Sequence, residues 1–290
     1  MNSRESERRR FLKTAGGAAI ALAAAGEAHG QSVQADNTTQ ALHEPNDRAD
    51  SGLWISWYDL PEEGRDAYFS WMHDTYLPGL LKRPGYLWAA HYSTTRGPEV
   101  SPNNLQHTND PSVPTGYRFI QLVSAKDATV FGNPVPSAIN AALPEEGRKM
   151  LAMRIGERVN LMTVMGVSEG RARNEYKEGL TSAPSIQIGS FNCPVEYQEE
   201  LHAWYVQVRV PAMCATDSCV RIRMLSSVAG WAKSAILYEF TDPKWYARDY
   251  EGTIKKGPQG MNGDNVVEKL VHAPHSSNSA VRLWPPVPKA

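Results

Sequence analysis

His73 is the side chain in this sequence best suited to proton transfer near neutral pH, where histidine can act as a general acid or base. The surrounding segment is rich in rings, which commonly line pockets for small molecules. The aromatic and imidazole residues of 54–92 that form the candidate site are Trp57, Tyr58, Phe69, Trp71, Tyr76, Trp88, His91 and Tyr92. A lone histidine on an apolar helix face is more often an inert core residue, and that alternative stays open.

Each type of side chain in this set suggests a role. A base would take a proton from the substrate, a hydroxyl would hydrogen-bond the oxyanion that develops, and indole rings would enclose the apolar part. The predicted catalytic residues are His73, Tyr58, Tyr76 and Tyr92. The predicted substrate-binding residues are Trp57, Trp71, Trp88, His91 and Phe69. The predicted partner is a small aromatic or apolar molecule.

The pattern around His73 predicts a strand, a helix and a second strand. An apolar run at 53–58 is typical of a strand, and Pro61 suits the first position of a helix over 62–82. Apolar residues three and four positions apart place His73 on the face that should pack on a sheet. Pro78 predicts a bend or an early end near Tyr76, because proline removes a helix hydrogen bond. A break at 84–85 precedes the second strand at 86–92.

The same order of elements occurs twice, which predicts two copies of a β-α-β-β-α-β unit. In the first copy, strands are also expected at 117–123 and 159–167. In the second copy, strands are expected at 186–191, 219–225, 235–240 and 266–272, and helices over 196–213 and from 242. Placing Pro211 over Pro78 puts Val206 at the position of His73. Only the first copy therefore has the histidine, although His202 could serve from another turn.

A sequence motif in the first helix adds a family resemblance. The residues Trp71-x-His73-x-x-Tyr76-Leu77-Pro78, followed by a Pro-Gly break and an aromatic strand, resemble the EthD-like and related families of the dimeric α+β barrel superfamily. The resemblance implies an α+β fold in which two tandem ferredoxin-like units form an intrachain dimeric α+β barrel. It also implies cofactor-free monooxygenase, lactone isomerase or polyketide cyclase and dehydratase chemistry, with His73 handling a proton of an aromatic or enolisable substrate.

The start of the chain predicts export. Residues 1–30 have the form of a twin-arginine signal peptide, with Arg8, Arg9 and an apolar run that is too short to span a membrane. The expected location is the periplasm or the exterior, without a stable membrane anchor. We expect a polar linker at 31–51, a first ferredoxin-like unit at 52–169, a linker at 170–184, a second unit at 185–275 and a tail at 276–290.

Charge and cysteine usage exclude some classes of function. The formal net charge is −1 and there is no basic block, so nucleic acid is not an expected partner. No metal-binding motif is present in the sequence.

Cys214 and Cys219 could form a short-range disulfide, with Cys193 left over and buried. Arg221 and Arg223 share a strand face, where they could clamp a carboxylate but are expected to face solvent or pair with acids such as Glu239.

These observations leave three hypotheses for function. The leading one is an exported, cofactor-independent enzyme that acts by acid–base chemistry on a small aromatic or enolisable substrate. The second is a haem-binding oxidoreductase of the same superfamily, with His73, His91 or His202 as axial ligand. The third is a small-ligand-binding protein without catalysis. The oligomeric state is expected to be a monomer or a homodimer of tandem units.

Overall fold

The computed structural model describes residues 50–95, 105–174, 182–245, 249 and 264–287. The predicted signal peptide and almost all of the 31–51 linker lie outside these residues. Within the described part of the chain, no helix is long and apolar enough to cross a membrane.

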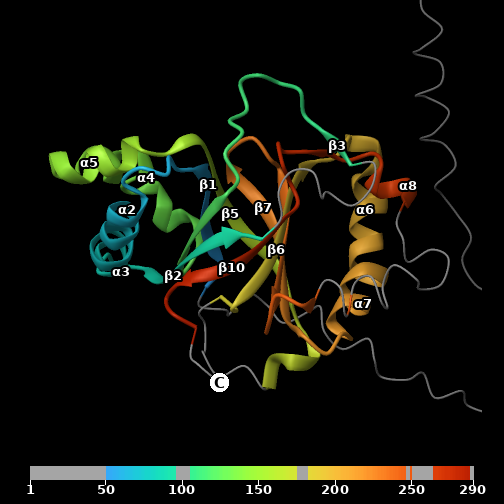
Figure 1. The fold of residues 1–290 in the computed structure, drawn as a ribbon. Helices are drawn as coiled ribbons and strands as arrows, with labels where there is room; N and C mark the ends of the chain where they lie inside the picture. Colours follow the sequence, from blue (N-terminus) through green and yellow to red (C-terminus); the bar gives the residue numbers. More distant parts are fainter. Residues whose placement is uncertain (1–49, 96–104, 175–181, 246–248, 250–263, 288–290) are drawn as a thin grey trace, which may run out of the picture. The chain divides into compact units, whose positions relative to one another are not determined.

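Within the described residues, eight antiparallel strands of one chain close into a barrel, and Figure 1 shows their arrangement. The strand order is β10-β2-β4-β1-β5-β7-β8-β6, and β10 also pairs with β6, which closes the circle. The barrel strands are β1 (Gly52–Asp59), β2 (Tyr86–Thr94), β4 (Phe119–Ala125), β5 (Ile155–Glu169), β6 (Ser185–Asn192), β7 (Cys219–Ala229), β8 (Ser234–Phe240) and β10 (Asn278–Trp284). Two short strands, β3 (Gln106–His107) and β9 (Val271–His272), extend the edge of β6. This arrangement confirms the predicted fold class.

Each half of the barrel is a ferredoxin-like sheet covered on one face by helices. The first half has α2 (Arg65–Trp71), η1 (Met72–Tyr76), α3 (Leu77–Leu81), η3 (Ala128–Gly132), α4 (Pro136–Ala141) and α5 (Glu145–Ala152). The second half has η5 (Val195–Tyr197), α6 (Gln198–Trp204), η6 (Tyr205–Arg209), α7 (Val210–Cys214) and α8 (Asp264–Val267), and η4 (Arg171–Asn174) follows β5. The large buried clusters lie inside the barrel and beneath the helices of each half.

The two copies keep an exact spacing through the first strand, the three parts of the first helix and the second strand. The elements that begin at Gly52, Arg65, Met72, Leu77 and Tyr86 have counterparts of the same type that begin 133 residues later, as in 52 and 185 for the first strands. The predicted alignment of the two prolines is therefore confirmed. Later elements lose this spacing because the connection between the second and third strands is shorter in the second copy.

A π turn explains how each first helix passes its proline. The helix was expected to bend or end near Tyr76, but it continues through the wide turn Met72–Tyr76 into Leu77–Leu81. The N–H of Leu77 donates to the carbonyl of Met72, five residues back, and Pro78 follows at once. The wider turn relieves the clash that proline makes with the carbonyl four residues before it. The second copy repeats the device at Tyr205–Arg209, ahead of Pro211.

The end of the second unit was predicted wrongly. The segment 266–272 was expected to be its last strand, but it contains the end of α8 and the two-residue β9. The fourth strand is β10, Asn278–Trp284, inside the segment that was expected to be a tail. It pairs with both β6 and β2, so the second unit extends to Trp284.

The three cysteines are free thiols. Cys214 and Cys219 hydrogen-bond to one another, and this contact together with burial raises the pKa of Cys219. Cys193 was expected to be buried, but it is only partly buried.

Candidate functional site

A chain of three hydrogen-bonded side chains runs from the first helix into the first sheet. Nε2 of His73, in the π turn, lies 2.8 Å from Nδ1 of His91 on β2. Nε2 of His91 lies 2.9 Å from the hydroxyl of Tyr58 on β1. Tyr58 and His91 are fully buried, whereas His73 is half-buried. The chain therefore links an interior phenol to an imidazole at the protein surface.

Arg154, just before β5, anchors the buried end of this chain. Its guanidinium donates to the Tyr68 hydroxyl at 2.7 Å and to Oε1 of Gln121 at 2.8 Å. It forms an ion pair with Glu157 at 2.6 Å. Its Cζ lies 4.3 Å from the centroid of the Tyr58 ring. A buried cation that is paired, hydrogen-bonded and stacked in this way can hold the phenol beneath it in one position.

The electrostatics keep the three groups neutral near pH 7. Burial lowers the pKa of His73, opposed by the nearby Asp74. Burial also lowers the pKa of His91 well below its usual value, and the neighbouring His73 and Arg154 act in the same direction. Burial raises the pKa of Tyr58 well above its usual value. A neutral His91 has one N–H and one lone pair, so it can link Tyr58 and His73 in either of two tautomers.

The two tautomers give His73 opposite roles. If His91 accepts from His73, then Nδ1 of His73 has a free lone pair and can act as a base. If His91 donates to His73, then Nδ1 of His73 has a proton and can act as an acid. Within the described residues, Nδ1 of His73 makes no hydrogen bond with the protein, so this nitrogen is the one left for a substrate.

Two partly exposed rings lie beside the outer end of the chain. The imidazole of His73 is nearly parallel to the rings of Phe69 and Trp284, with centroid separations of 5.8 Å and 6.2 Å. Phe69 comes from the same helix, whereas Trp284 comes from β10 and pairs with His91 in the β10–β2 register. A flat apolar molecule that reached His73 would contact these rings, as in sites where apolar walls surround a few polar atoms.

The second copy replaces this polar cluster with apolar side chains. By the spacing of the copies, Phe191 stands in place of Tyr58, Val206 in place of His73 and Met224 in place of His91. Gln121 pairs with His91 in the strand register as Ile236 pairs with Met224. The same fold thus forms without these polar groups, so the cluster in the first copy is not required by the architecture.

The structure brings together only part of the predicted site. His73, His91, Tyr58 and Phe69 are in direct contact. Tyr76 and Trp71 belong to the same helix-side cluster, where Trp71 stacks on Tyr76 at 5.0 Å and the Tyr76 hydroxyl donates to Asn140.

Three predicted residues lie on the other face of the sheet, because neighbouring strand residues point in opposite directions. Trp57, Trp88 and Tyr92 belong to the cluster inside the barrel. Nε1 of Trp88 donates to Asp50 at 3.4 Å and the hydroxyl of Tyr92 donates to the carbonyl of Ala183 at 2.7 Å. The sheet separates these three side chains from His73.

Four residues of the site were not predicted. Gln121 could have been noticed as a polar residue within the apolar run of β4. Arg154 is brought to the site by contacts between distant segments, which no local pattern reports, whereas Tyr68 lies on the same helix as His73, directly before the predicted Phe69. Trp284 was hidden in the segment expected to be a tail.

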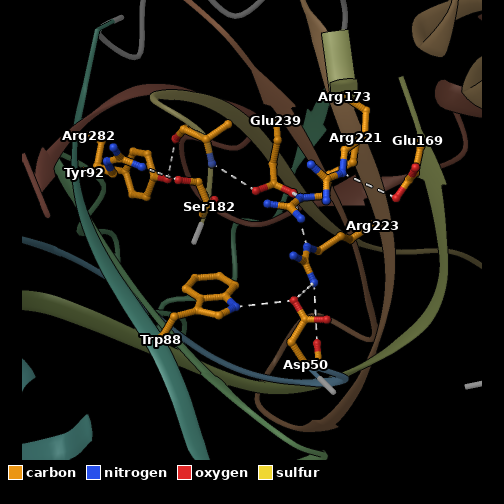
Figure 2. Close-up of polar contacts among 11 residues, drawn as sticks. Asp50, Trp88, Tyr92, Glu169, Arg173, Ser182, Arg221, Arg223, Glu239 and Arg282 are labelled. Carbon is orange, nitrogen blue, oxygen red and sulfur yellow. Dashed lines mark hydrogen bonds and ion pairs between the residues drawn. The ribbon is translucent and has the colours of Figure 1, made fainter. Parts of the chain in front are cut away.

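A second buried polar cluster lies inside the barrel, at the end where β1 begins (Figure 2). Glu239 accepts from Nε of both Arg221 and Arg223, at 2.5 Å and 3.2 Å, and Arg223 forms a further ion pair with Asp50 at 2.7 Å. All four side chains are buried. Both arginines were expected to face solvent or to pair with acids such as Glu239; they are buried and both pair with Glu239.

Of the three histidines considered as axial ligands of haem, His91 does not fit. Both ring nitrogens of His91 are engaged, one by Tyr58 and one by His73, and an iron bond would break one of these contacts. His73 uses Nε2 in the same chain, and His202 lies exposed on α6. Among the described residues, no group of three His, Cys, Asp or Glu side chains is arranged to hold a metal ion.

Solved structures show similarity to this fold. An anthrone oxidase-like protein has a TM-score of 0.51 at 9% identity, with 82% of this chain and 93% of that chain covered. A candidate monooxygenase from Fusobacterium nucleatum subsp. nucleatum has the same TM-score and identity, with 81% and 93% covered. A candidate chlorite dismutase has a TM-score of 0.45 at 12% identity, with 81% of this chain and 96% of that chain covered.

No protein-family model matches the chain, and no curated protein matches its sequence. At 9% identity, the structural similarity shows the dimeric α+β barrel fold and not an activity.

Proposed function

We propose that this protein is a cofactor-independent enzyme that moves a proton on a small aromatic or enolisable molecule at His73. The hydrogen-bonded chain from His73 through His91 to Tyr58 is the observation that carries this proposal. Its absence from the otherwise matching second copy supports a role beyond folding. The likeness to the EthD-like families, including their monooxygenases, isomerases and cyclases, stays a prediction from the helix motif.

The proposed step is a proton transfer to or from Nδ1 of His73. When Nδ1 takes a proton from a C–H or O–H of the substrate, the imidazolium that forms still donates through Nε2 to His91, which stabilises the charged form. The low pKa of His73 keeps the base neutral and ready at pH 7. Phe69 and Trp284 would contact the rings of the substrate, and the resulting anion would stay at the protein surface beside them.

The test uses an enolisable polycyclic ketone, and anthrone is the probe. The purified protein would be assayed for exchange of the acidic C–H protons with solvent deuterium and for oxygen consumption. We expect His73→Ala to lower the exchange rate by about 10²–10⁴-fold, the usual contribution of a positioned base. His202→Ala is the matched control, because His202 is an exposed histidine on the corresponding helix of the second copy.

The outcomes separate the hypotheses. Exchange with oxygen uptake supports a monooxygenase, and exchange without uptake supports an isomerase or lyase. Equal rates in His73→Ala and the parent protein would end the proposal. Binding of the probe without turnover, unaffected by His73→Gln, would support the ligand-binding alternative, and a Soret band in the purified protein would support the haem alternative.

Export and assembly are further parts of the proposal. Residues 8–13 support twin-arginine export to the periplasm or beyond. A monomer is favoured over a homodimer of tandem units, because one chain supplies both sheets and closes the barrel through the β10–β2 and β5–β7 pairings. Size-exclusion chromatography with light scattering tests this directly.

A further inference from the structure

A second candidate site lies inside the barrel, at the opposite end from the Glu239 cluster. Arg158 projects from β5 into the interior, where its guanidinium lies 4.0 Å from the centroid of the Trp57 ring and donates through Nη1 to Ser190 at 3.1 Å. Arg158 is 2% exposed. Trp57 belongs to β1 and Ser190 to β6, so the arginine links the two halves of the barrel.

Arg158 is a buried cation without a counter-charge. Among the described residues, no acidic side chain forms an ion pair with it, and its Nε and Nη2 atoms have no hydrogen-bond partner. Burial alone lowers the pKa of Arg158, to about 9, with no compensating acid. An ionised group in the interior is strongly disfavoured unless it is paired. The arginines at the other end of the barrel, by contrast, are paired with Glu239 and Asp50 (Figure 2).

The free atoms form a binding geometry. Nε and Nη2 lie on the same edge of the guanidinium, and their N–H groups point in the same direction. Two parallel donors of this kind match the two oxygens of a carboxylate or another planar oxyanion. The indole Nε1 of Trp57, in the ring beneath the guanidinium, is also buried without a partner and is a third donor.

We propose that Arg158 and Trp57 form a site for a small planar oxyanion, such as a carboxylate, inside the barrel mouth where β1 and β6 end. The anion would accept from the Nε–Nη2 edge of Arg158 while Ser190 holds Nη1. The site lies on the opposite face of the sheet from His73, so it is separate from the proposed catalytic chain. The test of this site measures melting temperature and anion binding, whereas the test of the catalytic chain measures deuterium exchange.

Thermal unfolding of the full chain would be measured in increasing sodium acetate or sodium nitrate, with sodium chloride keeping the ionic strength constant. The expected result is a saturable rise in melting temperature with either planar anion, because a ligand bound only by the folded state stabilises it. Sulfate, which is tetrahedral, should give a smaller rise. Isothermal titration with acetate gives the dissociation constant directly.

Three variants make the test specific. Arg158→Met should abolish the anion-dependent rise, and in chloride it should melt no lower than the parent protein because an unpaired buried charge is removed. Trp57→Phe keeps the ring face and loses the N–H, so affinity should fall by about tenfold. Arg223→Met is the control: it should melt lower, because it strands Asp50, and yet keep the anion effect.

Several results would overturn the proposal. One is that acetate and nitrate act no differently from chloride on the parent protein, and another is that the rise persists in Arg158→Met. If Arg158→Met did not fold, Trp57→Phe would decide: an unchanged dissociation constant for acetate would count against the site.

Discussion

Replacing the polar cluster with the residues of the second copy should remove the function and spare the fold. Two variants are compared. The single variant is His91→Met, and the triple variant adds Tyr58→Phe and His73→Val. These are the residues that occupy the same places in the second copy. The comparison asks whether the hydrogen-bonded chain is a unit that can be exchanged as a whole.

The magnitude follows from which polar groups lose their partners. His91→Met takes a hydrogen-bond partner from the half-buried His73 and from the fully buried Tyr58, which keeps its hydrogen bond with Tyr68. The loss of one buried hydrogen bond costs about 0.5–1.5 kcal/mol, which for a domain of this size is roughly 1–6 °C in melting temperature. In the triple variant Tyr68 loses its hydrogen bond with Tyr58 but keeps the one from Arg154, and the phenyl ring that replaces the phenol of Tyr58 would still lie beneath Arg154. Its stability should return to within about 1 kcal/mol of the parent protein.

Urea unfolding followed by tryptophan fluorescence measures the stability, and the deuterium-exchange assay with anthrone measures the activity. The expected pattern is a marked stability loss in the single variant, recovery in the triple variant and no activity in the triple variant. A triple variant less stable than His91→Met would refute the reasoning, because it would mean that the polar groups are part of the structural core.

Three further predictions concern pH and charge. The rate at His73 should rise with pH and level off above a pKa lower than 6.5, because the neutral base is the active form and burial lowers its pKa; a rising limb above 7 would contradict this. Burial lowers the pKa of His272 to about 4, so the unfolded state binds protons first as pH falls and about 3 kcal/mol of stability should be lost between pH 6.5 and 4. His272→Gln should flatten this dependence in urea titrations, and an unchanged slope would exclude His272 as its source. Glu239→Ala should cost about 3–5 kcal/mol by removing the carboxylate that Arg221 and Arg223 share in the barrel, and a loss below about 1 kcal/mol would show that water or an ion replaces it.

Periodicity and break residues were enough to predict the duplicated scaffold. Strand-like runs, helical spacing and the Pro-Gly break placed the first strand, helix and second strand of both copies within a few residues of their observed bounds. The continuation of the helix past Pro78 was missed because a π turn has no signature in residue type, and only the repetition at Pro211 shows that it belongs to the fold. The last strand was missed because the prolines that end the chain dominate its composition.

The segment that holds the site was predicted better than the faces on which its side chains lie or their contacts with distant segments. Strand alternation already implies that Tyr58 and Trp57 point in opposite directions, and likewise His91 and Tyr92, so the set could have been divided from the sequence. Arg154 could not have been found in that way, since its contacts join residues 68, 121 and 154 through folding alone. Long-range contacts of this kind decide which buried polar groups are satisfied.

The most direct test of the central claim is long-range nitrogen-15 NMR of the histidine rings as a function of pH, with and without anthrone. The account predicts that His91 stays neutral at and around pH 6.5 with both nitrogens hydrogen-bonded, and that His73 titrates below 6.5 and that its signals shift when the probe is added. A His91 ring that titrates near 6.5, or a His73 chemical shift that does not change when the probe is added, would contradict the account.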